Sequence, residues 1–242
     1  MLKKISVVIP FFNEEKNIPL VIKRIKKIYK KSKNLEFILI NNGSNDNSEI
    51  VFKNNLNKKD KRIKYFKIKK NIGYGYGIKY GLKKSKGRYV GWTHSDMQTD
   101  PIDILKAIKV INLKKDKKIF VKGKRQERSF KQSFQTKAME LCTYLILGYH
   151  LKDINAQPNI VSRQFYQKYL KKFAPNDLSF DLFAYYFNVK TNHTIKKINV
   201  VFKIRKFGET KGGGEGGSII TKIKLILVTL KCLFKIKFTN IN

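Results

Sequence analysis

Four short apolar runs, separated by segments with helical spacing, constrain the fold of this 242-residue chain most strongly. They are rich in Ile, Val and aromatic residues, as buried strands are, and they lie at Ile5–Ile9, Phe37–Ile40, Ile63–Ile68 and Tyr89–Trp92. Ile18–Tyr29 repeats apolar residues at 3- and 4-residue spacings, which predicts a helix. Ser48–Leu56 and Gly75–Lys84 are shorter helix candidates. Strands that alternate with helices predict an α/β fold with a mainly parallel sheet and a ligand site at the carboxyl ends of its strands.

The second half of the chain continues this mixture, and it contains no internal repeat and no linker before a glycine-rich run at 208–217. We therefore expect one domain over 1–217, with helices flanking its central sheet. We expect a helix over Ile102–Leu113 and a strand over Ile119–Val121, followed by a polar Lys/Arg/Gln stretch that favours a loop. Beyond this stretch we expect helices over Ala138–Leu147 and Leu182–Phe187 and a strand over Thr194–Ile204.

Beyond the glycines, residues 218–242 change character. Ile219–Phe238 is mostly apolar and, at about 1.5 Å per residue, nominally long enough to cross a bilayer, but a lysine near a membrane centre costs roughly 2.5–3.5 kcal/mol. Lys224, Lys231 and Lys235 fall on one stripe of the helical wheel. The pattern predicts an amphipathic helix that lies on an anionic membrane surface, or one that packs on the domain or on a second copy in a homo-oligomer.

Basic residues far outnumber acidic ones: 53 Lys and Arg against 17 Asp and Glu give a net charge of +36. Such a charge attracts polyanions, but the basic residues are spread along the chain and form no recognised nucleic-acid module, so we expect no nucleic-acid partner. Cys142 and Cys232 lie far apart without a CxxC pair, and the first residues lack a signal peptide. We expect a cytoplasmic protein, peripheral on the inner face of the cytoplasmic membrane.

Polar clusters follow three of the predicted strands, at Pro10–Glu15, Asn41–Asp46 and Thr93–Pro101. Each of the first two can also be read as a turn with a helix cap. In the third, Asp96 ends a buried strand and Gln98 follows two residues later, which offers hard oxygen ligands for Mg²⁺ or Mn²⁺. A helix cap before Pro101 is the alternative, although Asp100 is better placed for that role.

Six stretches in this order resemble the family-2 inverting glycosyltransferases, in particular the dolichyl-phosphate mannosyltransferase and polyprenyl-phosphate glycosyltransferase branch. The resemblance spans about Ile5 to Lys211 and implies a GT-A nucleotide-binding fold. The matching stretches are VVIPFFNEEKNI (7–18), ILINNGSNDNS (38–48), NIGYGYGIKYGLKKSKGRYV (71–90), SDMQTDP (95–101), GKR (123–125) and VVFKIRKFGETKGGG (200–214).

The resemblance assigns roles by position. Asp96 and Gln98 correspond to the metal-binding motif, Arg125 to a residue that faces the donor phosphates, and Asp153 to an aspartate beside the acceptor. Arg205 and Lys211 match a basic pair that holds an acceptor or donor phosphate. The residues that the resemblance assigns to binding of the nucleotide sugar are Pro10, Phe12, Glu14, Asn42, Ser44, Gly73 and Ser95.

Three departures from the family pattern stand out. Asn41–Asn42 replaces paired aspartates, and His94 replaces the first aspartate of the metal motif. The acceptor motif reads Asp153-Ile-Asn-Ala-Gln-Pro, without the usual Ser-Gly. A degenerate fold that binds sugar nucleotide without turnover is therefore one alternative.

The function implied is transfer of a hexose from a nucleotide-diphosphate sugar to a polyprenyl-phosphate or lipid-linked acceptor, with a divalent metal stabilising the leaving diphosphate. A lipid phosphate is already ionised and needs no base. A sugar hydroxyl, as in polysaccharide or O-antigen synthesis, needs one, and Asp153 is the candidate. The sequence does not reveal the sugar, the nucleotide or the oligomeric state.

Overall fold

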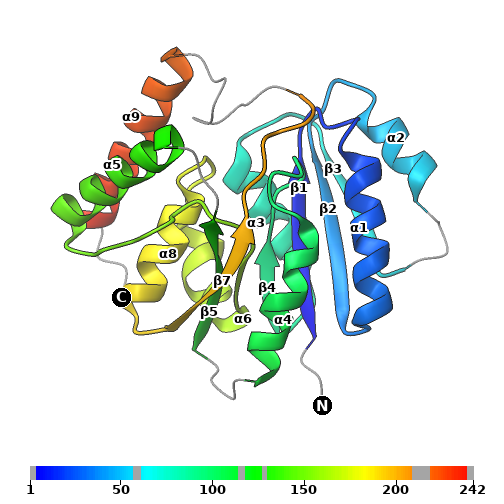
Figure 1. Ribbon diagram of the computed structural model, residues 1–242, viewed down its shortest axis with the longest axis horizontal. Helices are drawn as coiled ribbons and strands as arrows, with labels where there is room; N and C mark the ends of the chain where they lie inside the picture. Colours follow the sequence, from blue (N-terminus) through cyan, green and yellow to red (C-terminus); the bar gives the residue numbers. More distant parts are fainter. Residues whose placement is uncertain (1–3, 57–60, 114–117, 127–129, 209–218, 239–242) are drawn as a thin grey trace.

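The computed structural model describes residues 4–56, 61–113, 118–126, 130–208 and 219–238. These residues form one seven-stranded sheet with helices on both faces (Figure 1). Its strands are β1 (Ile5–Phe11), β2 (Leu35–Asn42), β3 (Ile63–Ile68), β4 (Tyr89–Trp92), β5 (Ile119–Gln126), β6 (Asn159–Ser162) and β7 (Thr194–Val201). Their order across the sheet is β3-β2-β1-β4-β6-β5-β7.

Six of the strands in the described ranges are parallel to one another, and β6 alone opposes them. β1 pairs in parallel with β2 and β4, β2 with β3, and β5 with β7, whereas β6 is antiparallel to both β4 and β5. The predicted mainly parallel sheet is confirmed. Because β1, β2 and β4 are neighbours in the same direction, the polar segments that follow them meet at one edge.

The helices that the structure describes follow the βαβ pattern in the first half of the chain. The longer ones are α1 (Ile18–Lys31), α2 (Ser48–Asn55), α3 (Tyr74–Lys84), α4 (Ile104–Leu113), α5 (Phe130–Leu147), α8 (Phe180–Lys190) and α9 (Ile219–Phe238). A 3₁₀ turn at Pro101–Asp103 leads into α4, and α6 (Arg163–Phe165), a π-helical turn at Tyr166–Leu170 and α7 (Lys171–Phe173) form one winding segment after β6.

The sheet separates two apolar layers, and the alternation of side chains along β1 shows why. Val7 and Ile9 belong to the layer under α1 and α4, while Val8 belongs to the layer under α3 and α8. Successive side chains of a strand point to opposite faces, so a strand buried on both faces needs apolar residues at every position. This is why the strands appear in the sequence as unbroken apolar runs.

Three predicted elements had wrong boundaries. Part of the polar stretch expected to be a loop belongs to β5, which continues to Gln126, and α5 begins at Phe130 rather than Ala138. The strand expected to reach Ile204 ends at Val201, because the next backbone hydrogen bond of this segment, from Lys203 N, goes to Gln98 O at 2.8 Å instead of to the sheet. The predicted domain boundary at 217–218 lies outside the described residues.

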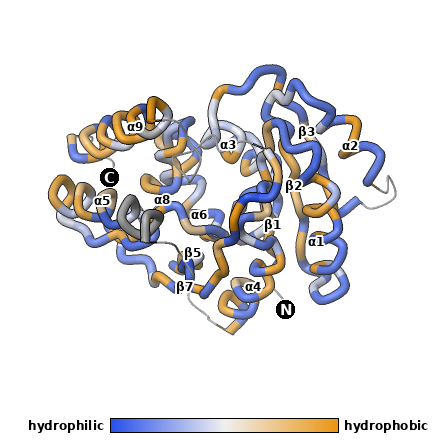
Figure 2. The backbone as a smooth tube through the Cα atoms, turned by 45° about the horizontal axis from the view of Figure 1, so that its top comes forward, coloured by the Kyte–Doolittle hydropathy of each residue, from blue (hydrophilic) through white to orange (hydrophobic). Residues whose placement is uncertain are grey.

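α5 and α9 lie side by side at one end of the molecule (Figures 1 and 2). The predicted bounds of α9 are confirmed. Leu233 and Ile236 of α9 are buried in the apolar layer that α8 also covers, so the helix packs on the domain through one of its sides.

Candidate active site at the carboxyl ends of β1 and β4

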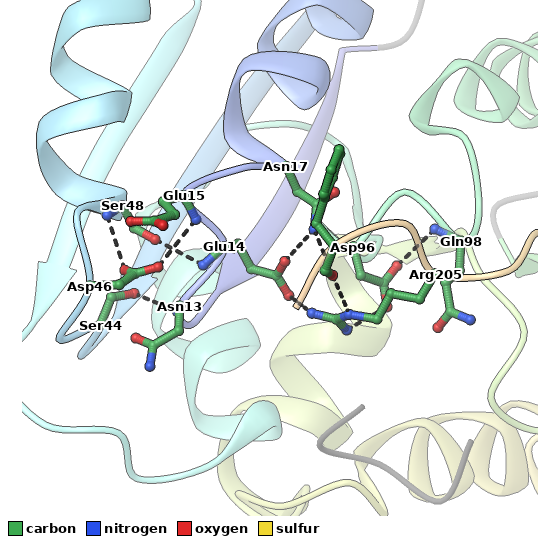
Figure 3. Close-up of polar contacts among 11 residues, drawn as sticks. Asn13, Glu14, Glu15, Asn17, Ser44, Asp46, Ser48, Asp96, Gln98 and Arg205 are labelled. Carbon is green, nitrogen blue, oxygen red and sulfur yellow. Dashed lines mark hydrogen bonds and ion pairs between the residues drawn. The ribbon is translucent and has the colours of Figure 1, made fainter. Parts of the chain in front are cut away.

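Backbone amides of the segment after β1 are tied to side chains of the segment after β2. Asn13 N donates to Ser44 Oγ at 3.0 Å and Glu14 N to Ser48 Oγ at 2.9 Å. Glu15 N donates to Asp46 at 3.2 Å, on the same side of the site (Figure 3). The two polar clusters of the sequence therefore form one rigid rim, and Ser44 works in it as a hydrogen-bond acceptor.

Asn42, at the end of β2, joins this rim to the start of α3. Its Nδ2 donates to Gly73 O at 3.1 Å and to Asn71 Oδ1 at 3.3 Å. A Cβ atom on Gly77 would lie 3.2 Å from Pro10 and from Asn42, so the three residues are in close contact. Among the described residues no donor meets the buried Oδ1 of Asn42. Pro10, Asn42 and Gly73, all predicted to bind the nucleotide sugar, are thus brought together.

Glu14, Asp96 and Arg205 form the charged centre of the site (Figure 3). Arg205 Nη2 lies 2.6 Å from Glu14 Oε1, and its Nη1 lies 3.6 Å from Asp96 Oδ2. The side chains of Glu14, Asp96 and Arg205 are 8%, 15% and 13% exposed. The family resemblance places Glu14 with the nucleoside and Arg205 with a phosphate, and it does not predict their contact.

Glu14 is buried well enough to disturb its ionisation. Burial raises the pKa of its carboxyl group, while the hydrogen bond from Asn17 and the charge of Arg205 oppose that rise. Asn17 Nδ2 donates to Glu14 Oε2 at 2.6 Å, so each carboxylate oxygen has a strong partner. The carboxylate is held in one orientation by these two donors.

The segment after β4 turns sharply around Asp96. Met97 has a positive φ of 60°, and Gln98 N donates to Asp96 Oδ1 at 3.0 Å. Gln98 Nε2 donates to Lys203 O at 3.3 Å, and Ser95 is buried. Asp96 and Gln98 therefore sit on one tight turn, with one oxygen of Asp96 used by the turn and the other directed at Arg205.

A second buried carboxylate, Asp181 on α8, is bonded to the end of β4 and was missed from the sequence. It is 3% exposed, and burial raises the pKa of its carboxyl group. Four side chains donate to it: Trp92 Nε1 at 2.6 Å, Gln157 Nε2 at 2.9 Å, Asn159 Nδ2 at 3.2 Å and Tyr74 OH at 3.3 Å. The available signal was an aspartate inside the otherwise apolar helix Phe180–Phe187.

Tyr74 links Asp181 to the rest of the site. Its ring lies 5.5 Å from that of His94 between centroids, and the charges of Asp96 and Arg125 both act on its hydroxyl. Burial, the first cause, and Asp181 raise the pKa of Tyr74 well above its ordinary value. His94, which replaces a family aspartate, therefore packs against a neutral phenol.

Arg125 lies on β5, and Asp153 lies in the segment that precedes β6. Arg125 Nη2 donates to Asn155 O at 2.6 Å, and its guanidinium lies 4.2 Å from the centre of the Phe202 ring. Asp153 is buried with a positive φ of 59°, and Lys122 Nζ donates to its carbonyl oxygen at 2.5 Å. No hydrogen bond or ion pair described here joins Asp153 to Asp96.

Phe12 and Lys211 are the two remaining predicted site residues. Phe12 is half-buried on the rim. Lys211, the partner of Arg205 in the predicted basic pair, lies outside the described residues. No cluster of three or more His, Cys, Asp or Glu side chains that would bind a metal by itself occurs in the described ranges.

The geometry suits a cation that brings oxygen ligands of its own. Glu14 and Asp96 place two carboxylates around one guanidinium, so the site carries an excess of one negative charge at its centre. Carboxylate oxygens are hard ligands that Mg²⁺ and Mn²⁺ accept, and such ions commonly complete their coordination with substrate phosphates. The residues present therefore fit a divalent ion bound together with a diphosphate.

Solved structures share this fold at low sequence identity. A glucosyl-3-phosphoglycerate synthase from Mycobacterium tuberculosis, in complex with Mn²⁺, UDP and glucosyl-3-phosphoglycerate, aligns with a TM-score of 0.69 and 19% identity over 97% of this chain and 80% of its own. A mannosyltransferase from Pyrobaculum calidifontis, in complex with GDP-Man and Mn²⁺, aligns with a TM-score of 0.61 and 16% identity over 86% of this chain and 59% of its own. These likenesses confirm the GT-A fold.

Curated relatives match about half of the chain. An undecaprenyl-phosphate 4-deoxy-4-formamido-L-arabinose transferase of Pectobacterium atrosepticum is 30% identical over 132 residues, which are 54% of this chain and 40% of that protein. The protein of the same name from Proteus mirabilis is 32% identical over 104 residues, 43% of this chain and 32% of its own. The aligned part thus spans less than half of these relatives' length. Residues 6–179 match the family described as glycosyl transferase family 2, and the chain belongs to that family.

Proposed function

We propose that this chain is an inverting glycosyltransferase that moves a hexose from a nucleotide-diphosphate sugar to a polyprenyl phosphate, with help from Mg²⁺ or Mn²⁺. The main observation in support of this proposal is the position of Asp96 at the carboxyl end of β4, beside Glu14 and Arg205, in a family-2 domain. The match to two undecaprenyl-phosphate sugar transferases supports the acceptor. The Mn²⁺ and nucleotide in the complexes of the structural neighbours support the donor and the metal.

Charge is the physical problem in this reaction, because a nucleoside diphosphate leaves as an anion while the anomeric carbon becomes positive. A divalent ion, held by Asp96 with Gln98 nearby, would supply Lewis-acid stabilisation of the diphosphate. Arg125 would face the donor phosphates and add a positive charge there. Pro10, Asn42 and Gly73 would line the nucleoside pocket, where the unpartnered Oδ1 of Asn42 is ready to accept a hydrogen bond from a base or ribose.

A phosphate acceptor needs orientation rather than deprotonation. It is ionised at neutral pH, so a basic side chain that fixes its position is enough to promote attack. Arg205 is proposed for this role, and Asp153 is proposed to lie beside the acceptor.

The test combines donor binding and lipid transfer. Thermal shift with UDP-, GDP- and dTDP-sugars, each with and without Mn²⁺, should raise the melting temperature for one nucleotide and more so with metal. That donor, radiolabelled, should then yield a lipid-linked sugar with undecaprenyl phosphate. Absence of any shift, together with no labelled lipid, would leave the degenerate fold as the better interpretation.

We further propose that the protein works on an anionic membrane surface, at the inner face of the cytoplasmic membrane, through α9. Seven exposed apolar residues lie on one side of α9, namely Ile219, Ile220, Ile223, Ile226, Leu227, Phe234 and Phe238. Lys224, Lys231 and Lys235 are exposed along the edge of this apolar side. No helix in the described part of the chain is long and apolar enough to span a bilayer. An apolar side edged by lysines fits insertion at the headgroup level.

α5 extends this apolar end of the molecule. Leu141, Tyr144 and Leu145 are 57%, 42% and 70% exposed and recur at helical spacing on one side of the helix next to α9. Exposed apolar patches of this extent mark interaction surfaces. Because lysines accompany the apolar side of α9, an anionic lipid surface complements it better than an uncharged one.

Vesicle flotation tests the surface. The protein should float with vesicles that contain phosphatidylglycerol, and much less with pure phosphatidylcholine. Exchange of Lys224, Lys231 and Lys235 for Gln should abolish the preference. The matched control replaces Lys23, Lys27 and Lys30, three exposed lysines of α1, and should leave it intact. If no vesicle binds and gel filtration shows a dimer that Leu227→Glu disrupts, the face contacts a second copy instead.

A further inference from the structure

Arg205 pairs with two carboxylates that lie more than 100 positions before it in the chain. Its guanidinium lies 2.6 Å from Glu14 and 3.6 Å from Asp96, and its Nε donates to Phe207 O at 2.8 Å. Glu14 and Asp96 follow different strands, β1 and β4, and this one side chain contacts both of them (Figure 3). The guanidinium occupies the place where two acidic side chains converge.

The segment that carries Arg205 is attached to the site and not to the sheet. β7 ends at Val201, and the backbone of Lys203 instead exchanges hydrogen bonds with Gln98, from Lys203 N to Gln98 O at 2.8 Å and from Gln98 Nε2 to Lys203 O at 3.3 Å. Phe207 O also accepts a longer bond from Asn17 Nδ2 at 3.5 Å. A few contacts around Arg205 therefore hold residues 203–207 across the ends of β1 and β4.

A divalent ion on Asp96 and a guanidinium in its present position are in conflict. Two cations this close repel each other, and each carboxylate oxygen that coordinates a metal is no longer free for Arg205. The incoming diphosphate offsets part of this repulsion with its own negative charge, but it does not return a metal-bound carboxylate oxygen to Arg205. Of the two cations, we expect the guanidinium to leave the carboxylates, because the divalent ion carries the larger charge.

We propose that Arg205 is a resident counter-ion that the donor-bound divalent metal displaces from Glu14 and Asp96, and that its displacement frees residues 203–207 so that the guanidinium can bind the acceptor's phosphate. The proposal rests on the proposed donor site. Its consequence is an order of binding: the phosphate site is complete only after the donor and metal have arrived. Without them, Arg205 stays paired with the two carboxylates and is itself unavailable.

The first experiment measures Mn²⁺ affinity calorimetrically on the whole chain, alone and with the nucleoside diphosphate that gave a thermal shift. Arg205→Gln should bind Mn²⁺ about fivefold or more tightly than the parent, the lower end of couplings between linked sites. Arg205→Lys, which keeps the charge, should stay closer to the parent. The matched control is Lys206→Gln, which removes an exposed charge from the neighbouring position and should change affinity less than about twofold.

The second experiment follows amide hydrogen exchange of residues 203–207. Exchange should accelerate in the parent when Mn²⁺ and the nucleotide bind, and it should already be fast in Glu14→Gln without them, because that variant loses one anchor of Arg205. This readout does not depend on Arg205 variants folding.

The outcomes separate the two proposals. A parent that binds no Mn²⁺ with UDP, GDP or dTDP overturns the donor site and the exchange with it. A parent that binds Mn²⁺ while Arg205→Gln binds it equally or more weakly overturns the exchange alone. Slower exchange at 203–207 on donor binding would show that the segment closes over the donor, which also contradicts the proposal.

Discussion

Trp92 Nε1 donates to Asp181 Oδ1 at 2.6 Å across 89 positions of sequence. Trp92 is the last residue of β4, just before the turn that carries Asp96, and Asp181 is on α8. The bond joins the strand that carries Asp96 to a helix on one face of the sheet. Both partners are buried, so the position of the β4 end depends on a carboxylate that solvent does not reach.

We expect Asp181→Ala to destabilise the fold strongly. The substitution leaves the buried donors of Trp92 and Asn159 without an acceptor and removes one of two acceptors from Gln157, at about 1–3 kcal/mol for each group that water cannot reach. A loss of about 3 kcal/mol or more in the free energy of unfolding, measured by urea denaturation, is the expected result. Asp177→Ala, at an exposed position of the preceding turn, is the control and should cost no more than about 1 kcal/mol. Equal stability of the two variants would contradict the role given to Asp181.

Asp96→Asn should abolish metal-assisted transfer while the fold is kept. The amide keeps the size of the side chain but removes the negative charge that a divalent ion requires, so transfer should fall about 100-fold or more and lose its response to Mn²⁺. The control is Asp100→Asn, on the same segment, whose carboxylate instead caps Ile102 and pairs with Arg24 at 2.8 Å. A folded Asp96→Asn protein that transfers sugar at the parent's rate would exclude metal binding by this residue.

Local pattern was enough to predict the first four strands and the helices between them, because each is a run of apolar residues with a clear period. β6 was missed since Asn159–Ser162 is only four residues long and has polar residues at both ends. Its identity as a strand depends on pairing with β4 and β5, which no local period records.

Local sequence pattern also predicted part of the site. Asp96 and Gln98 follow a predicted strand directly, so their place at the sheet edge could be derived. The contact between Glu14 and Arg205 spans 191 positions and depends on a segment that leaves the sheet after Val201. Asp181 could not be predicted because its helix is apolar on every side. Such a helix shows no apolar periodicity that would distinguish a core position from a position in the site.

Gly81→Ala should destabilise the packing of α3 on the sheet. A Cβ atom there would lie 2.4 Å from Val8 Cγ1 and 3.1 Å from Ile40 Cγ1, closer than atoms in a core approach. We expect a net loss of about 1–2 kcal/mol, since overpacking exceeds the gain in helix propensity from alanine. Repeating Gly81→Ala in a Val8→Ala background should lower that cost, because the clashing methyl groups are gone. An unchanged cost in both backgrounds would show that the strain lies elsewhere.

Lys122 gives the fold a specific pH dependence. It is fully buried on β5, its Nζ lies 4.8 Å from the centre of the Tyr185 ring, and burial lowers the pKa of its ammonium group to about 7. The charges of Asp153 and Asp181 act against this lowering without cancelling it. Between pH 7 and the ordinary lysine value of 10.5, the unfolded chain therefore holds a proton here that the folded chain has released.

Stability must rise with pH wherever the unfolded state binds more protons, so Lys122 contributes a positive slope of up to about 1.4 kcal/mol per pH unit above pH 7. Lys122→Met removes this titration and should flatten the slope of the unfolding free energy between pH 7.5 and 9.5, whatever its effect at a single pH. Lys124→Met, at an exposed position of the same strand, should keep the parent's slope. The difference in slope is the diagnostic quantity, because lost hydrogen bonds to Asp153 O and Gly123 O would shift stability by a similar amount at every pH. Parallel curves for the parent and Lys122→Met would mean that Lys122 stays charged in the folded protein.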